Sequence, residues 1–453
     1  MSSLVQEHEL RSAKPGSSEQ PLQDSNATQQ EPHQHHVVDV EHRNSAWVCV
    51  LGSFLFLMPS FGFMQSSGAI QSFLLENQLR DFSARDVGWI TGVYSFLTMF
   101  LGIQAGPLMD VYGPGLLGPV AAGILVLMFF LLAECAKFWQ FLLCLGVLGG
   151  IGNAIATTVG IAVIGKLFNR RKGLALGIAL SGSSTGGIIF PLALRQMFPM
   201  WGWEWSMRAM GVLAILIMIL GIVCLLPFER LHAIVKNEGV ATERSRKKAV
   251  MDFSAFKSVP FSLICGAIAL LEFVIFGATA ILPTLVALSG FSMEHGFNML
   301  AILNGFSSLG RILPGLVGDR LGHYNILLVM IIFTIVCTAA TLTAFGSTRI
   351  DALYAFSTLW GFGTGSFLSL APACVAKTCE PKDYGRSYGL GTMNFVISFS
   401  LLLTMPIGGQ MLESLGSTAL SGLYLAVVFA GGTLVYAGRS VVVGSWANFR
   451  ERI

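Results

Sequence analysis

Residues 106–113 read GPLMDVYG, and residues 315–322 read GLVGDRLG. Both stretches have the pattern G-x-x-x-D-x-x-G, and they start 209 residues apart. Glycines within residues 150–152 are matched by glycines within residues 361–365 at a similar offset. Long apolar runs lie before and after each of these stretches. The chain therefore has two halves in which the same elements follow in the same order.

The composition is that of a membrane protein. Of the 453 residues, 53% are hydrophobic and only 12% are charged, whereas soluble domains have about 25% charged residues. We therefore expect an all-α polytopic membrane protein in contact with the lipid bilayer. The net charge of +3 is small and gives no indication of a nucleic-acid partner.

Apolar runs long enough for a tilted membrane helix occur twelve times. The first six are expected at about 46–71, 88–108, 115–135, 139–166, 173–197 and 207–227. The second six are expected at about 260–287, 297–317, 325–345, 352–377, 386–411 and 417–438. The prediction is twelve transmembrane helices in two six-helix halves, the layout of parallel repeats in secondary transporters.

The same pattern predicts where the parts of the chain begin and end. The segment before the first apolar run is rich in Ser, Gln, Glu, His and Pro, which is typical of disorder. The predicted parts are a disordered cytosolic tail (1–45), an N-terminal half (46–228), a cytosolic basic linker (229–258), a C-terminal half (259–440) and a cytosolic tail (441–453).

The basic residues predict the orientation in the membrane. With both termini in the cytosol, about 21 Lys and Arg lie on the cytosolic side and about 6 on the other side. The inverted orientation would violate the positive-inside rule. We therefore expect a multi-pass protein of the cell membrane with both termini cytosolic.

The sequence gives no sign of an enzyme, a metal site or a cofactor. The eight cysteines have no C-x-x-C spacing, and all eight histidines lie in the tail or in loops. An intramembrane hydrolase would need a histidine pair or paired carboxylates within the spans. A channel would need a ring of carbonyls or charges, which nothing in the sequence suggests. A transporter-like sensor stays an alternative.

Two ionisable residues lie deep within predicted spans. Glu272 lies about 18 Å and Arg311 about 9 Å from the cytosolic ends of their helices, at 1.5 Å per residue. A charge at such a depth costs about 2.5–3.5 kcal/mol, so both residues are functional candidates. Two hypotheses stay open. The residues form a structural ion pair, or Arg311 anchors an anionic substrate and Glu272 accepts a proton.

The two motif copies are candidate gating elements. An Asp just past a helix end can cap the next helix and pair with a base across the interface between the halves, and the glycines allow a short turn. Packing of the loops is the alternative interpretation. The candidate gating residues are Gly106, Asp110, Gly113, Gly315, Asp319 and Arg320.

The motif copies resemble the signature of the major facilitator superfamily, and the resemblance covers residues 46 to about 440. The stretches FNRRKGLALGIALSGSSTGG (168–187) and LNGFSSLGRILPG (303–315) resemble the fungal monocarboxylate-porter branch. The resemblance implies the major facilitator fold, alternating access, and a cavity lined by the first, fourth, seventh and tenth helices. It nominates as substrate-binding candidates Gln65, Asn153, Glu272 and Trp360, with Asn304 and Asn394 from flanking helices, in addition to Arg311, whose charge and depth already make it a candidate. For each polar residue a hydrogen bond between helices is the alternative.

Two departures from this branch bear on the substrate. Where proton-coupled members have an Asp four residues before the arginine, this chain has Ser307, and their basic residue in the first span corresponds to Gln65. The cavity therefore has less charge, and 33 Phe residues can supply apolar surface. We expect efflux of an amphipathic or weakly acidic small molecule, such as a secondary metabolite, from a fungal cell. The alternative is proton-coupled uptake of a short monocarboxylate or vitamin-like compound.

Overall fold

The structure is a computed structural model that describes residues 43–168, 171–238, 256–345, 348–378, 390–446, 448 and 451. The predicted disorder of the N-terminal tail and the basic cluster at 244–248 lie outside the described residues. Within the described ranges the chain is almost entirely helical and contains no strand. The predicted all-α fold is therefore confirmed.

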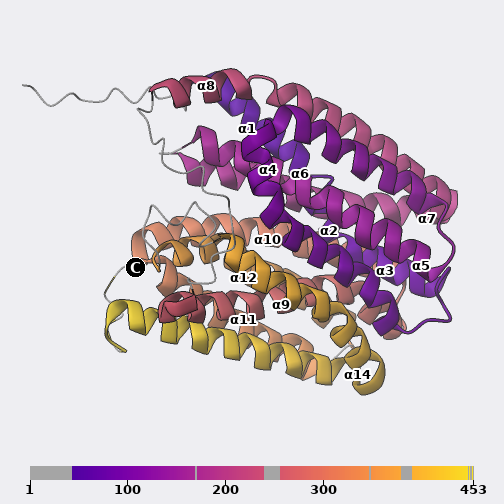
Figure 1. Cartoon of the computed structure of the whole chain (residues 1–453). Coiled ribbons are helices and arrows are strands. Elements are labelled where there is room, and N and C mark those ends of the chain that lie inside the picture. Colours follow the sequence, from indigo (N-terminus) through magenta and orange to yellow (C-terminus); the bar gives the residue numbers. More distant parts are fainter. Residues whose placement is uncertain are drawn as a thin grey trace, which may run out of the picture. The chain divides into compact units, whose positions relative to one another are not determined.

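The helices follow the order that the repeat predicts (Figure 1). The first half contains α1 (Asn44–Leu57), α2 (Phe61–Gln65), α3 (Ser67–Glu76), α4 (Ala84–Ala133), α5 (Phe138–Phe141), the π-helical turn η2 (Leu142–Gly149), α6 (Gly150–Leu167) and α7 (Lys172–Leu225). The second half contains α9 (Val259–Leu288), α10 (Met293–Leu321), α11 (His323–Thr338), the π-helical turn η4 (Ala339–Thr343), α12 (Ile350–Ala376) and α14 (Leu390–Val443). Between them lies α8 (Phe228–Glu238).

Three of the helices are too long for one crossing, and each is broken at a glycine. α4 has 50 residues and breaks at Gly113 (φ 68°), α7 has 54 and breaks at Gly202 (φ 68°), and α14 has 54 and breaks at Gly416 (φ 81°). Gly322 (φ 95°) ends α10. A positive φ costs little free energy only for glycine. A single glycine can therefore form each of these turns without additional loop residues. Gly113 and Gly322 are the last residues of the two motif copies.

Eight segments of the described chain are long and apolar enough to cross a membrane by length and composition. Three of them contain the breaks at glycine, and α12 is a further helix of 27 residues. Dividing the long segments at their glycines and adding α12 gives twelve segments in the described part of the chain. That each of the twelve crosses a membrane stays a prediction.

The structure differs from the sequence prediction in the first span. A continuous helix was expected over 46–71, but the chain forms the separate helices α1, α2 and α3. The hydroxyls of Ser60 and Ser66 donate to the carbonyls of Phe56 (2.7 Å) and Gly62 (3.2 Å) around the breaks. Hydroxyl groups that satisfy backbone carbonyls make a broken membrane helix tolerable. Broken helices of this kind occur at the binding sites of transporters.

Two further boundaries differ from prediction. Residues 106–112 and 315–321 are helical, so that only the final glycine of each motif copy forms the turn. The predicted linker begins with the helix α8, whose described residues include the buried Phe228 and Leu231 and the exposed Glu229. A buried apolar face and an exposed charged face are typical of a helix at a membrane surface.

The ends of the helices define two sides of the protein. The side where α1 begins and α8 packs is called the terminal side. The side where α3 ends and α4 begins is called the far side. On the far side the two halves are in close contact. The backbone N–H of Ala84 in α4 donates to Oε1 of Glu413 in α14, and a Cβ added to Gly409 would lie 2.7 Å from Ala84. A Cβ at Gly68 of α3 would likewise clash with the backbone of Ala280 in α9.

Candidate functional site

Arg311 is hydrogen-bonded to a residue of the other half. Its Nη1 donates to Oγ of Ser183 at 3.1 Å, so that α10 of the second half is joined to α7 of the first. Ser183 is fully buried. Arg311 is conspicuous in the sequence as a charge within an apolar span, whereas Ser183 is marked only by the polar run 181–185 in which it lies.

The rest of the Arg311 guanidinium has no partner among the described residues. Its Nε and Nη2 are buried and make no hydrogen bond there. These two nitrogens form one edge of the planar group, and such an edge fits the two oxygens of a carboxylate. A buried, unpartnered donor pair is costly unless a ligand satisfies it.

Glu272 of α9 is a second buried ionisable residue and is not bonded to Arg311. Its side chain is only 8% exposed, and its charge interacts with that of Arg311. Within the described ranges no ion pair joins the two side chains, and Glu272 has no hydrogen bond. The Nε–Nη2 edge is thus buried without a partner among the described residues, and whether Glu272 and Arg311 serve as a structural pair or bind a substrate stays a prediction.

Asn304 lies two turns from Arg311 on α10 and also contacts the other half. Its Nδ2 donates to the carbonyl of Gly187 in α7 at 3.2 Å and to that of Leu300 at 2.9 Å. A Cβ on Gly187 would lie 2.7 Å from Cγ of Asn304. The side chain of Asn304 thus forms a hydrogen bond between helices. Such a bond is the alternative interpretation to ligand binding. Its Oδ1 is buried and has no partner in the described part of the chain.

A third link between the same helices lies at the far side. Arg195 of α7 forms an ion pair with Glu294 of α10 (2.9 Å) and donates to Oδ1 of Asn298. Sequence analysis missed this pair because both charges lie near the ends of predicted spans, where charged residues are ordinary. α7 and α10 are therefore joined at three levels along their length, with Arg311 nearest the terminal side.

Gln65 and Asn153 belong to the first half. Asn153 is fully buried, and its Nδ2 donates to Oγ1 of Thr98 at 3.1 Å and approaches Sδ of Met64 at 3.7 Å. Oε1 of Gln65 and Oδ1 of Asn153 are buried and have no partner among the residues described. Phe61 and Gln65 are the first and last residues of α2. The ring of Phe61 contacts that of Phe276 in α9 (6.3 Å between centroids, edge to face).

Trp360 and Asn394 lie in the second half. Trp360 of α12 is 1% exposed, and its ring packs against Phe356 (5.2 Å) and Tyr424 (6.2 Å). Its Nε1 has no hydrogen-bond partner in the described ranges. Asn394 is half-buried on α14. No contact that the structure describes joins either residue to Arg311, so their assignment to the binding site stays a prediction.

The first motif copy is connected within its own half. Asp110 forms an ion pair with Lys166 at the end of α6 (2.8 Å), whereas a base of the other half was expected. Asp110 also lies inside α4 and caps no following helix, because the helix continues to Gly113. A Cβ on Gly113 would meet Oε1 of Glu229 in α8.

Three glycines toward the terminal side have no close neighbours. A Cβ added to Gly106 of the first motif copy, to Gly315 of the second or to Gly177 would meet nothing within 4 Å. A Cβ on Gly318, within the second copy, would lie 3.1 Å from Cδ2 of Leu370. Arg320 is exposed, and the side chain of Asp319 lies outside what is described. The close contacts between the halves at the far side have no counterpart at these three glycines.

The sequence of residues 45–401 matches the Major Facilitator Superfamily. The chain belongs to this superfamily. This major facilitator is 30% identical to the aspyridones efflux protein of Emericella nidulans, covering 87% of this chain and 78% of that protein. It is 29% identical to the agnestins efflux protein of Paecilomyces divaricatus (87% of each chain) and to a riboflavin transporter of Saccharomyces cerevisiae (89% and 80%).

A solved structure supports the fold of this major facilitator. The crystal structure of a nucleoside transporter superposes with a TM-score of 0.65 at 14% identity, covering 87% of this chain and 99% of that one. At this identity the likeness concerns the fold alone. The superfamily and these relatives are transporters, which confirms that the chain is a membrane transport protein and not an enzyme. The resemblance to monocarboxylate porters is supported only as membership of the wider superfamily.

Proposed function

We propose that the protein is a secondary active transporter that exports a weakly acidic or amphipathic small organic molecule by alternating access. Arg311 binds the anionic group of the substrate. The observation that supports this proposal most is the state of its guanidinium, which is bonded through Nη1 to Ser183 and has a buried, unpartnered Nε–Nη2 edge.

The bond to Ser183 orients the guanidinium. With Nη1 held at 3.1 Å from a buried hydroxyl, the open edge has a fixed direction before any substrate arrives. A carboxylate or enolate then forms two parallel hydrogen bonds without first ordering the side chain. Since Ser183 belongs to the first half and Arg311 to the second, the substrate binds at an interface that must rearrange during transport.

Glu272 balances the charge of Arg311 when the site is empty. Binding of an anion adds a negative charge to a buried site that already contains a carboxylate, and such a charge is expensive. A proton on Glu272 restores neutrality. We therefore expect that one proton accompanies each singly charged substrate, so that the substrate crosses as the neutral acid. The direction of net transport is then set by the sum of the substrate gradient and the proton gradient, and export requires the outward substrate gradient to be the larger.

The positions of the contacts between the halves fit one state of the transport cycle. The halves meet at the far side, through Ala84 with Glu413 and Arg195 with Glu294. In the predicted orientation the terminal side is cytosolic, and this state receives substrate from the cytosol. Opening of the far side then releases it outside, in the direction of efflux.

The relatives favour efflux and also support a second candidate. Two of them are named as efflux proteins of fungal metabolites and one as a riboflavin transporter. Uptake of a neutral, vitamin-like ring compound is the second candidate, because a transporter with a similar sequence has that name. Uptake of a short monocarboxylate is the remaining alternative.

Counterflow in proteoliposomes tests these proposals. Vesicles containing the purified protein are loaded with unlabelled benzoate, riboflavin or acetate, and uptake of the same labelled compound is followed. We expect transient accumulation of benzoate, faster at acidic than at neutral pH and unaffected by a membrane potential. Accumulation of riboflavin alone would favour the second candidate, and acetate alone would favour the short-monocarboxylate alternative. Absence of counterflow with each compound would favour a transporter-like sensor.

A further inference from the structure

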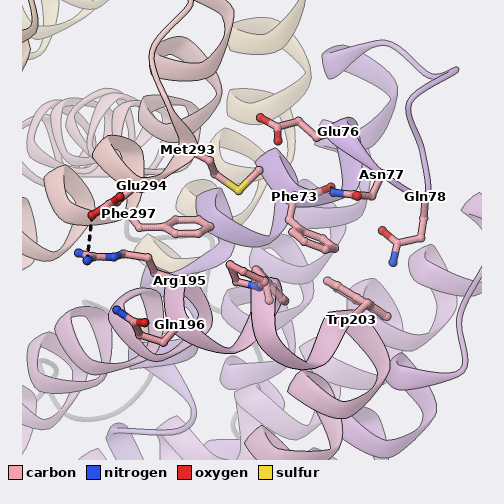
Figure 2. Close-up of a pocket in the computed structure, with 13 residues that line it drawn as sticks. Phe73, Glu76, Asn77, Gln78, Arg195, Gln196, Trp203, Met293, Glu294 and Phe297 are labelled. Carbon is pink, nitrogen blue, oxygen red and sulfur yellow. Dashed lines mark hydrogen bonds and ion pairs between the residues drawn. The ribbon is translucent and has the colours of Figure 1, made fainter.

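A cavity with a volume of about 710 Å³ lies at the far side of the protein. Figure 2 shows it between the end of α3, the broken region of α7 and the beginning of α10. Phe297 at this cavity and Arg311 are 14 residues apart on α10, which corresponds to about 21 Å of helix. The cavity is therefore separate from the candidate substrate site, and its size is within the usual range for small-molecule pockets.

Three aromatic rings lie nearly parallel along one wall of the cavity. Phe73 of α3 stacks on Phe198 of α7 with 3.9 Å between centroids and 27° between planes. Trp203 is within 18° of both ring planes, at 5.6 Å from Phe73 and 5.8 Å from Phe198. Its Nε1 donates to the carbonyl of Leu132, which fixes the indole. A planar aromatic molecule can continue such a stack, whereas a saturated ring cannot.

Polar groups lie beside the aromatic wall. Oε1 of Gln78 is buried and has no hydrogen-bond partner in the part of the chain that the structure describes, so it can accept a bond from a ligand N–H or O–H. The charges of Arg195 and Glu294 at the other edge neutralise each other at 2.9 Å (Figure 2). Glu76 also lines the cavity and has no ion pair among the described residues, so the cavity favours a hydrogen-bond donor over an anion.

Both halves contribute to the cavity. Phe73, Phe198 and Trp203 belong to the first half, and Met293, Glu294 and Phe297 belong to the second. The cavity must change shape when the halves separate at the far side, because α10 moves relative to α7. A molecule bound here is therefore held in the state in which the far side is closed.

From this geometry we propose that the far-side cavity is a second binding site for planar aromatic molecules that have a hydrogen-bond donor, placed on the route beyond the Arg311 site. The aromatic part of the molecule stacks on Phe73 and Trp203, and a donor group bonds to Oε1 of Gln78. The position on the route rests on the proposed transport function. Binding in the cavity does not, because it depends only on these side chains.

Riboflavin is a suitable probe, because it is planar, has N–H and O–H donors, and fluoresces. An indole ring in contact with the flavin quenches this fluorescence by electron transfer. The full-length protein in detergent is titrated with riboflavin, and quenching and equilibrium dialysis are measured. We expect saturable binding with quenching. In Trp203→Leu and Phe73→Leu, which keep an apolar side chain but remove a ring, we expect affinity to fall about 2- to 10-fold, and in Trp203→Leu we also expect loss of quenching.

Matched variants separate the cavity from other effects. Trp201→Leu removes an exposed tryptophan that does not line the cavity, and its riboflavin binding should equal that of the wild type. Gln78→Leu removes the acceptor with little change in volume and should weaken binding without abolishing quenching. Gel-filtration profiles and melting temperatures identify any variant that misfolds.

The outcomes for the two proposals are distinct. If Trp203→Leu, Phe73→Leu and wild type bind riboflavin equally, or if the wild type does not bind it, the cavity proposal is wrong, whatever benzoate counterflow shows. If Arg311→Gln loses benzoate counterflow but binds riboflavin with wild-type affinity, both proposals stand as separate sites. If counterflow is absent in the wild type while the cavity binds riboflavin as expected, only the transport proposal fails.

Discussion

Arg195 of α7 and Glu294 of α10 form an ion pair of 2.9 Å that joins the two halves at the far side. The side chain of Arg195 is 28% exposed and that of Glu294 is 57% exposed. An ion pair with this exposure contributes little free energy, about 0.5–1 kcal/mol. Such a contribution cannot hold a transporter shut, but it shifts the population of the state in which the far side is closed.

Loss of this pair is expected to open the far side more often. In Glu294→Gln the population of the open state should rise about 2- to 5-fold, following the free energy above. The measurement is the rate at which a membrane-impermeant maleimide labels a cysteine introduced at Phe297, which is 2% exposed. Labelling in the parent protein should also rise with salt, because salt screens a partly exposed pair.

Arg208→Gln is the matched control for the far-side pair. Arg208 pairs with Glu134 at 2.6 Å, but both residues belong to the first half. Its loss should leave the labelling rate at position 297 unchanged. Equal rates in Glu294→Gln and the parent protein would show that the Arg195 pair does not influence closure.

Gly187 is expected to accept no larger residue while the halves are closed. In Gly187→Ala the new methyl group would lie 2.7 Å from Cγ of Asn304, whose own hydrogen bonds restrain it. Transport should fall by at least about fivefold, the equivalent of roughly 1 kcal/mol of overpacking. Asn304→Ala in the same protein makes room and should restore most of the loss.

The control for this change lies on the same helix. Gly177→Ala places a methyl group where nothing lies within 4 Å, and transport should stay at the parent level. Initial transport rates at equal surface expression provide the comparison. If the Gly187→Ala protein transports normally, the contact with Asn304 does not limit closure.

The repeat and the apolar runs predict most of this fold. Helix ends agree within a few residues in most spans, because a membrane helix must be apolar over its full length. The break around Ser60 and Ser66 was not predicted, since two serines among many apolar residues leave the span as a whole apolar enough to cross a membrane. The continuation of α10 through residues 315–321 was also missed, because the glycine and aspartate of the motif suggested an earlier end.

The candidate site shows a different limit of sequence analysis. Arg311 and Glu272 were identified because a charge within an apolar run is conspicuous. Ser183 and Gly187, which contact Arg311 and Asn304, are small residues of ordinary membrane-helix type. Their role depends on which face of α7 meets α10, and a sequence without a solved interface does not give that rotation.

The second motif copy should matter for transport more than the first. Asp319→Asn is expected to reduce transport several-fold while membrane insertion stays normal, since Asn keeps the size of the side chain and removes its charge. Asp110→Asn breaks the pair with Lys166, in which Asp110 is 70% exposed, so its effect should be below about twofold. Both effects are measured as transport rates corrected for surface expression. Equal rates in Asp319→Asn and the parent would show that this motif contributes only to packing.

The orientation of the protein can be tested at the basic cluster. An epitope and protease site inserted between Arg244 and Lys248 should be protected from external protease in intact cells, because basic loops remain in the cytosol. The site should be cut after the cells are permeabilised. A second tag between Arg80 and Phe82, before α4, serves as the opposite control and should be cut in intact cells. Cleavage at 244–248 from outside would overturn the predicted orientation.

The role of Arg311 is tested by a cycle of four proteins: the parent, Arg311→Gln, Glu272→Gln and the double variant. If Arg311 binds the substrate, Arg311→Gln should abolish benzoate transport, and so should the double variant, because neither has the bidentate donor pair. Arg311→Lys keeps the charge but loses the planar edge, and its apparent affinity should fall by at least about tenfold. Surface expression should change less than transport, since Arg311 makes its hydrogen bond to Ser183 and not to Glu272.

The alternative gives the opposite pattern in the same cycle. If Arg311 and Glu272 serve only to neutralise each other, each single change leaves an uncompensated buried charge and lowers expression, and the double variant recovers both expression and transport. Restored transport in the double variant would therefore exclude Arg311 as a substrate ligand. The Glu272→Gln variant tests proton uptake separately from anion binding. It should still bind benzoate, as measured by exchange at equal concentrations, but it should lose the acceleration of counterflow at acidic pH, because its amide cannot accept the proton that neutralises the occupied site.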